Sequence, residues 1–276
     1  MSQSVYTLLC ERDMQMAKIT LPRMLFFCKK KQKIRVVDDG TLSEYSINWL
    51  ESLSDNIKVI RKSMRDELVL DTINKFPGCM KFRNEYPPSF KIIDIPILAK
   101  LESPRFTYSD SDIIYIRNSS KYFELNCDSF IRTDAIKLSV KLSTAFFKYK
   151  WKIPFKFNSG FFCYDTNNFD LDIIDYFVSR PDVRNMPWVI EQTAWAILFG
   201  KTSSICPLES EFVCSESFLG PDNKTCAIHL IGNLKSKFIE WSDFKLEESN
   251  FVPSFEKARN INFIDWSKKS FKRFTK

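Results

Sequence analysis

The order of apolar and polar positions predicts strands that alternate with helices along most of the chain. Short apolar runs bounded by polar residues predict strands over 5–10, 34–37 and 56–60. Between and after them, apolar residues recur at helical spacing and predict helices over 43–53 and 64–76. This alternation is typical of an α/β domain with a largely parallel sheet.

The same alternation continues in the second half of the chain. Thr133 and Asp134 form a suitable helix start, so a helix is predicted over 135–149. Further helices are predicted over 169–179 and 190–199. The central sheet is expected to be completed by three strands, which cover 106–114, 155–164 and 226–231.

Length and composition indicate one large α/β domain that buries a substantial core. The chain has 276 residues, of which 44% are hydrophobic. Its eight cysteines are scattered without a C-x-x-C pair, which argues against a zinc site and a thioredoxin-like redox site. No apolar segment is long enough to cross a bilayer and the first residues do not resemble a secretion signal, so we expect a cytoplasmic protein.

Two carboxylates and the single histidine of the chain are candidate metal ligands. Asp110, Ser111 and Asp112 precede the apolar run 113–116, and His229 lies in a late apolar segment. In an extended or tightly turned segment, Asp110 and Asp112 can converge on one ion. Carboxylate oxygens suit Mg²⁺ or Mn²⁺, and an imidazole favours Mn²⁺. By itself, Asp-Ser-Asp is equally an ordinary polar turn.

Four segments in this order resemble the GT-A glycosyltransferases, in particular the retaining family of glycogenin and the bacterial lipopolysaccharide galactosyl- and glucosyltransferases. Residues 106–114 look like the metal strand of that family, and residues 157–162 look like its Asn-Ser-Gly sugar-binding strand. Glu191-Gln192 stands where many members have Asp-Gln. The late segment 229–235 is similar to the histidine-x-x-glycine-x-x-lysine element. The resemblance spans about residues 4–241.

The resemblance implies a GT-A fold, which is a single Rossmann-like α/β domain with a mixed central sheet, over residues 1–250. It implies that Asp110, Asp112 and His229 bind Mn²⁺ or Mg²⁺, that Ser111, Gly232 and Lys235 lie at the diphosphate, and that a nucleotide sugar, most simply a UDP-sugar, is the donor. The implied sugar-binding residues are Asn158, Ser159 and Gly160. Glu191 is implied to contact sugar hydroxyls and Gln192 to lie near the reacting carbon, with retention of configuration.

These segments also have plain structural interpretations. Asn158, Ser159 and Gly160 can form a β-bulge in an aromatic strand, and Glu191 can be a dipole partner in a first helical turn. Ligands of open α/β sheets bind beyond the carboxyl ends of the strands, so the ends of the first two predicted strands should line one crevice. In GT-A enzymes the corresponding early strands hold the nucleotide, and the resemblance therefore makes Thr7 and Asp39 candidates for nucleotide binding. The sequence around Asp39 is also that of an ordinary turn.

The net charge of +7 is concentrated in two places. One is a run from Lys29 to Arg35, and the other is a predicted C-terminal tail, residues 251–276, in which lysine and arginine alternate with phenylalanine. Such a tail suits peripheral contact with the inner face of an anionic membrane, or it is simply solvated. No nucleic-acid-binding motif is present, so nucleic acid is not an expected partner.

Two functional hypotheses follow. The first is a metal-dependent glycosyltransferase that transfers a hexose to a glycan or glycolipid acceptor. The second is a non-catalytic nucleotide-binding or basic interaction protein on a GT-A-like fold. The set of Asp110, Asp112, His229 and Lys235 favours the first, because a protein without catalysis has no physical need for two such carboxylates facing one histidine.

Overall fold

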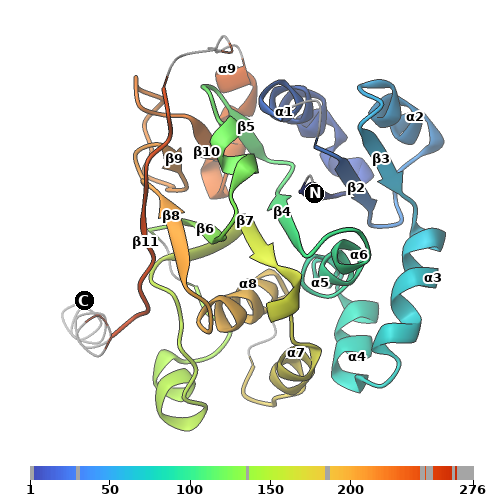
Figure 1. Cartoon of the computed structure of the whole chain (residues 1–276), viewed down its shortest axis with the longest axis vertical. Helices are drawn as coiled ribbons and strands as arrows, with labels where there is room; N and C mark the ends of the chain where they lie inside the picture. The colour runs from blue at the N-terminus through green and yellow to red at the C-terminus, as the bar shows by residue number, and fades with distance from the viewer. Residues whose placement is uncertain are drawn as a thin grey trace.

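The computed structural model describes residues 3–28, 32–134, 137–183, 187–242, 246, 251–262 and 265. Within them, the chain folds around a central sheet of eight strands in the order β11-β8-β6-β7-β4-β1-β2-β3 (Figure 1). The strands are β1 (Ser4–Leu9), β2 (Ile34–Asp38), β3 (Ile57–Ile60), β4 (Arg105–Ser109), β6 (Asp128–Arg132), β7 (Phe157–Asp165), β8 (Ser204–Pro207) and β11 (Phe255–Lys257).

The sheet is mixed. β1, β2, β3 and β4 run parallel, whereas β7 is antiparallel to both β4 and β6, and β11 is antiparallel to β8. The parallel half thus matches the sheet type expected from the hydrophobic pattern, and the whole sheet is the mixed type of the GT-A expectation. Residues 255–257 of the predicted tail form β11, the edge strand of this sheet.

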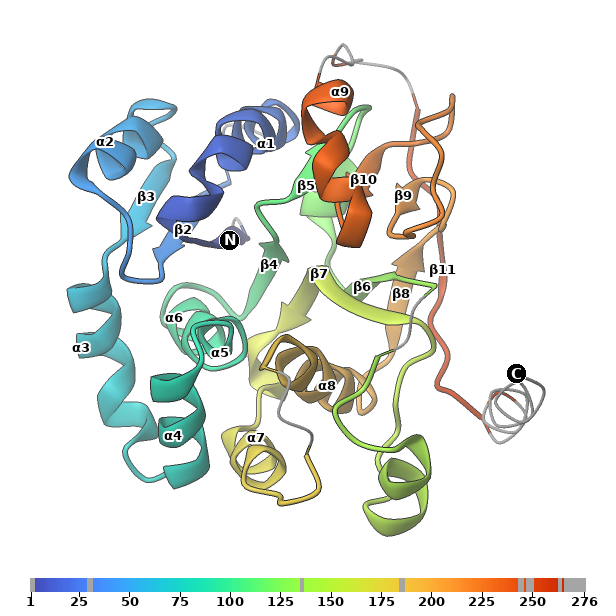
Figure 2. The same cartoon turned by 180° about the vertical axis from the view of Figure 1, so that it is seen from behind.

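Helices cover both faces of the central sheet (Figures 1 and 2). One face packs on α1 (Met14–Phe27) and α2 (Glu44–Ser52). The other packs on a larger group: α3 (Lys62–Ile73), α4 (Pro77–Glu85), α6 (Asp94–Glu102), α7 (Leu171–Val178) and α8 (Pro187–Phe199). Val36 and Val37 are buried in the cores on opposite faces of the sheet, because successive side chains of a strand point to opposite faces and both faces are covered by helices.

A second, three-stranded sheet stands beside the first and carries the late histidine. It consists of β5 (Ile113–Tyr115), β10 (Ala227–His229) and β9 (Phe212–Val213) in that order. Its outer face is covered by the short turn 232–237 and by α9 (Phe238–Ser242). The prediction that residues 226–231 join the central sheet is therefore wrong. The chain leaves the central sheet after β4, at Asp110, and forms β5, with which β10 pairs.

The helix predicted over 135–149 is also wrong in its described part. Residues 137–141 are irregular, and only residues 142–148 are helical, with a single π-helical turn over Thr144–Lys148. The amide of Ser139 donates to Thr193 Oγ1 (2.9 Å), and Gln192 Nε2 donates to the carbonyl of Lys137 (3.3 Å). In this segment, hydrogen bonds to α8 replace the hydrogen bonds that a helix would make within itself. The sequence of the segment alone does not show that such partners exist elsewhere in the chain.

The remaining predicted elements are present in the expected order, with small shifts at their ends, whereas the strands β6, β8 and β9 were not predicted. The helix expected over 43–53 begins after Ser43, whose side chain accepts a hydrogen bond from the amide of Ser46. α1, α4 and α6 were not predicted, nor was the short helix α5 (Ser89–Ile92). All eight cysteines are free thiols. None of the described helices is long and apolar enough to cross a membrane.

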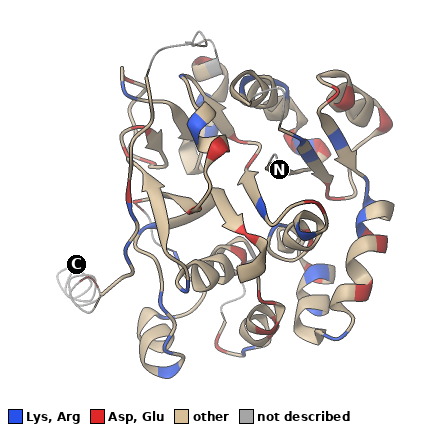
Figure 3. Ribbon diagram, in the orientation of Figure 1, with Lys and Arg blue, Asp and Glu red and all other residues tan. Residues whose placement is uncertain are grey.

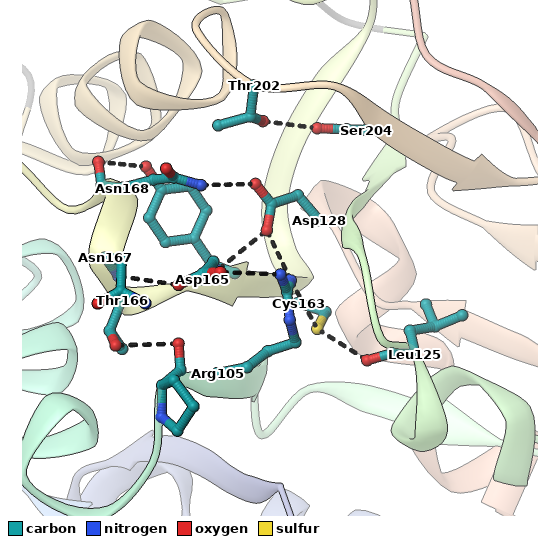
Figure 4. A network of polar contacts seen from close by, with 12 residues as sticks. Arg105, Leu125, Asp128, Cys163, Asp165, Thr166, Asn167, Asn168, Thr202 and Ser204 are labelled. Carbon is teal, nitrogen blue, oxygen red and sulfur yellow. Dashed lines mark hydrogen bonds and ion pairs between the residues drawn. The ribbon is translucent and has the colours of Figure 1, made fainter.

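One end of the central sheet is held by a network of charged side chains (Figure 4). Arg105, at the start of β4, pairs with Asp128 at the start of β6 (2.7 Å) and with Asp165 at the end of β7 (3.2 Å). Asp128 also accepts a hydrogen bond from the amide of Asp165. These residues lie at the amino end of β4, so the opposite end of the sheet is the one available for a ligand.

Candidate active site

A cleft of about 600 Å³ opens at the carboxyl ends of β1, β2 and β4, where α/β sheets bind their ligands. This volume is typical of small-molecule sites. All but one of the residues predicted as functional line it: Asp39, Asp110, Ser111, Asp112, Asn158, Ser159, Gly160, Glu191, Gln192, His229, Gly232 and Lys235.

Thr7 is the exception. It is fully buried within β1 and does not line the cleft, where Leu8, Leu9 and Cys10 take its place at the end of the strand. Its nucleotide-binding role therefore has no support from its position. Asp39 does line the cleft, and it also caps its own turn by accepting bonds from the amide and hydroxyl of Thr41.

The centre of the cleft is a group of three potential metal ligands. Asp110 and Asp112 lie in the turn between β4 and β5, and His229 ends β10. Each of the three offers a ligand atom within 4.8 Å of the other two. His229 Nε2 lies 3.1 Å from Asp112 Oδ1 and 3.5 Å from Asp110 Oδ2. β10 pairs with β5 directly after this turn, and the amide of Leu230 donates to the carbonyl of Asp112, so the turn is held in place by the end of β10.

The donor set fits a divalent cation. Asp112 Oδ1 is buried and makes no hydrogen bond, although His229 Nε2 is nearby. His229 Nδ1 lies 3.2 Å from Asn158 Oδ1, a contact that leaves Nε2 facing the two carboxylates. Two carboxylates and an imidazole that is oriented by an amide oxygen are a common ligand set for Mn²⁺ or Mg²⁺.

Gly160 allows the histidine to approach β7. A Cβ atom at this position would lie 2.2 Å from His229 Cε1, which no side chain larger than glycine can accommodate. The carbonyl of Gly160 also accepts a 2.7 Å hydrogen bond from the amide of Asp110. The glycine of the Asn-Ser-Gly segment therefore lets β7 contact both His229 and Asp110.

Two lysines balance the charge of the carboxylates. Lys235 Nζ lies 2.9 Å from Asp112 Oδ2, and the buried Lys91 Nζ lies 3.1 Å from Asp110 Oδ1. Burial by itself would raise the pKa of Asp112, but His229 and Lys235 hold it below its usual range. Burial likewise works to lower the pKa of His229, and the carboxylate of Asp112 raises it well above its usual value.

Glu191 lies on the same wall of the cleft but in a different electrostatic environment. It is buried at the start of α8, accepts a hydrogen bond from Ser159 Oγ (3.1 Å), and has Lys91 Nζ 3.8 Å away. Burial raises its pKa to about 7, against the opposing effect of Lys91. Its neighbour Gln192 accepts a hydrogen bond from Asn158 Nδ2 at 3.4 Å.

Lys91 is a site residue that was not predicted. Its side chain touches Asp110 and Glu191 and lies over the ring of Tyr108, whose hydroxyl donates to Asp110 (2.6 Å). A signal was present in the sequence, since Lys91 is the one charged residue in the segment Ser89-Phe90-Lys91-Ile92-Ile93. A lysine in such an apolar environment needs a carboxylate partner.

Comparisons with known proteins agree on the fold. The chain matches no protein-family model, and no curated protein matches it. Solved structures do match over most of its length. They include mouse xyloside xylosyltransferase 1 (TM-score 0.53, 13% identity, 84% of this chain and 98% of that one). The galactosyltransferase LgtC, solved with donor and acceptor sugar analogs, matches with a TM-score of 0.50 and 13% identity over 91% of this chain and 98% of that one.

The bifunctional glycosyltransferase WbbM also matches, with a TM-score of 0.55 and 11% identity. That match covers 88% of this chain but only 50% of WbbM, so this chain spans about half the length of that protein. The chain has a GT-A-like fold. The fold expected from the resemblance is therefore confirmed, and the predicted motifs line the cleft described above.

Proposed function

We propose that this chain is a metal-dependent glycosyltransferase that transfers a hexose from a UDP-sugar to a glycan or glycolipid. The proposal rests on one observation: Asp110, Asp112 and His229 offer ligand atoms within 4.8 Å of one another in a cleft of about 600 Å³. The GT-A-like fold supports it, since the matched structures are named as glycosyltransferases.

In this proposal Asp110, Asp112 and His229 hold Mn²⁺ or Mg²⁺. The bound cation would supply Lewis-acid stabilisation of the departing diphosphate. Lys235, whose side chain is 55% exposed, is free to turn from Asp112 toward the diphosphate and add positive charge there. Asp39, at the β2 end of the cleft, would accept hydrogen bonds from the ribose or base.

The other wall of the cleft would bind the donor sugar. Asn158, Ser159 and Gly160 form its floor, and buried Glu191 has one oxygen, Oε1, that makes no hydrogen bond. That oxygen would accept a bond from a sugar hydroxyl, because a buried acceptor that makes no hydrogen bond gains most from a donor. Gln192 would lie near the reacting carbon. Lys91, whose Nζ lies 3.1 Å from Asp110 Oδ1, would hold Asp110 in place.

The test is UDP binding measured by calorimetry with Mn²⁺ and with EDTA. Wild-type protein should bind UDP at least tenfold more tightly with Mn²⁺, and Asp112→Asn, which keeps shape but loses charge, should abolish the difference. Asp172→Asn, an exposed change on α7, serves as the control and should behave as wild type. Equal binding of UDP with and without metal would reject the site.

Turnover separates this proposal from the non-catalytic alternative. A screen of nucleotide sugars for metal-dependent release of UDP should find at least one donor. Metal-dependent binding of UDP without turnover of any donor would instead support a nucleotide-binding protein on this fold.

We further infer that configuration is retained. The pairing of Glu191 with Gln192 beside the Asn158 to Gly160 strand is the pattern implied by the retaining family, and Glu191 is hydrogen-bonded to Ser159. An α-linked donor should therefore give an α-linked product, which NMR of the anomeric proton would detect. A β-linked product would make Glu191 the general base and leave the metal site unchanged.

A further inference from the structure

Trp188 is a large aromatic side chain that the fold leaves half exposed at the cleft. It lies in the first turn of α8, lines the cleft and is 50% exposed. Trp195, on the same helix, is fully buried in the core. Half of the Trp188 side chain stays exposed although it lies in a concave site, and ligand pockets are lined mainly by hydrophobic and aromatic side chains, so its position suits contact with a ligand.

Helical spacing places Trp188 in line with the two polar residues of the proposed reaction site. Glu191 and Gln192 follow it at i+3 and i+4, which puts all three side chains on one face of α8. Glu191 and Gln192 are 5% and 8% exposed, so the row runs from the outside to the floor of the cleft. Four helical residues span about 6 Å, roughly the width of one sugar ring.

Lys137 completes this wall of the cleft. Its Nζ lies 5.2 Å from the centre of the Trp188 ring, and no carboxylate among the described residues pairs with it. The main chain of Lys137 is fixed, because its carbonyl accepts from Gln192 and the nearby Ser139 amide donates to Thr193. An exposed cation–π contact contributes only about 0.5–1 kcal/mol, so the ammonium group is easily moved by a ligand.

The wall lies on the side of the cleft away from the proposed nucleotide site. In the sheet, β2 and β1 precede β4 and β7, and β6 follows them. Asp39 belongs to the β2 end, the metal ligands follow β4, and Thr133, which leads toward Lys137, follows β6. A donor that extends from Asp39 past the metal ligands to Glu191 would therefore leave the surface of Trp188 free.

We propose that Trp188 and Lys137 form the acceptor subsite, and that they bind the terminal pyranose of a glycan acceptor. The inference rests on the proposed transferase function. The indole matches the apolar face of a pyranose, and Lys137 Nζ supplies a donor for its hydroxyl groups. A ring stacked on Trp188 presents its edge to Glu191 and Gln192, one helical turn away, where transfer would take place.

The experiment compares wild type, Trp188→Ala and Trp188→Phe, with Tyr176→Ala as a control at an exposed aromatic residue on α7. Each protein, saturated with UDP and Mn²⁺, is applied to a glycan array, and the dissociation constant is then measured for the glycan that wild type binds best. Trp188→Ala should weaken glycan binding at least tenfold, whereas Trp188→Phe should stay within about threefold and Tyr176→Ala should equal wild type. UDP affinity should be the same in all four proteins.

The possible results separate the two proposals. Unchanged glycan affinity in Trp188→Ala overturns the acceptor subsite, and so does a wild-type protein that binds UDP but no glycan on the array. Loss of glycan binding together with loss of UDP binding in Trp188→Ala would show a general disturbance of the cleft and also overturn it. Failure of wild type to bind UDP with Mn²⁺ rejects the transferase function and this inference with it.

Discussion

At the scale of single residues, the cleft combines carboxylates with opposite electrostatic environments. Asp112 is ionised because His229 and Lys235 contact it directly. Glu191 is more deeply buried, with 6% of its side chain exposed against 15% for Asp112, and its nearest cation, Lys91, is 3.8 Å away and is also paired with Asp110. Burial therefore dominates at Glu191 and direct ion pairing dominates at Asp112.

The raised pKa of Glu191 predicts a pH-dependent gain in stability for Glu191→Gln. The folded pKa is about 7 and the ordinary value 4.5, so between these pH values the folded state binds more protons than the unfolded state. Wild-type stability should then fall as pH rises through this window, by up to about 3 kcal/mol. Glutamine does not ionise, so Glu191→Gln should not lose stability in this way as the pH rises.

Urea unfolding at pH 5 and pH 8 checks this prediction. Glu191→Gln should gain stability relative to wild type on going from pH 5 to pH 8. A stability difference that is the same at both pH values would mean that Glu191 ionises normally in the folded protein. Lys148→Met, an exposed change far from the cleft, controls for general effects of pH.

At the scale of elements, a buried ion cluster connects four helices behind the cleft. Asp94, which begins α6 and is fully buried, pairs with Arg83 of α4 (2.8 Å) and Arg65 of α3 (3.2 Å). Both guanidinium groups lie over the ring of Phe90 in α5. Because Lys91 is the next residue of α5, this cluster holds the lysine that contacts Asp110.

Asp94→Asn should therefore be strongly destabilising. It leaves two buried arginines with only the partly exposed Asp66 as a counter-charge, and removing one partner of a buried ion pair costs about 3–5 kcal/mol. Asp66→Asn is the matched control and should cost about 1 kcal/mol, since water can reach that carboxylate. Equal losses for the two variants in urea unfolding would contradict the assigned importance of Asp94.

At the scale of the whole molecule, the cleft depends on two sheets that meet at one turn. The central sheet supplies Asp39 and the Asn158 to Gly160 strand, and the small sheet supplies His229. The Asp110 to Asp112 turn belongs to both, because it joins β4 to β5. Lysine and arginine are interspersed with acidic residues over the described elements (Figure 3), and the basic tail beyond residue 265 lies outside them.

Local signals in the sequence were enough to predict much of the fold and most of the site. Short apolar runs predicted β1, β2 and β3, because these strands are buried on both faces. Apolar residues at helical spacing predicted α2 and α3, because these helices bury one face against the sheet. The site residues, such as Asp110, Asp112 and His229, were predicted from the resemblance of four short segments to the GT-A glycosyltransferases, because each segment by itself also fits an ordinary structural role.

Only the tertiary structure decided which distant groups meet. The helix expected over 135–149 was wrong because Ser139 and Lys137 bond to α8, and the strand expected at 226–231 lies outside the central sheet because β10 pairs with β5. The positions of Lys91 and Trp188 in the cleft likewise depend on how α5 and α8 pack in the folded chain. The periodicity of a segment indicates which of its residues are buried. The carboxylate that pairs with a lysine, the acceptor for a backbone amide and the partner of a strand edge all come from elsewhere in the chain.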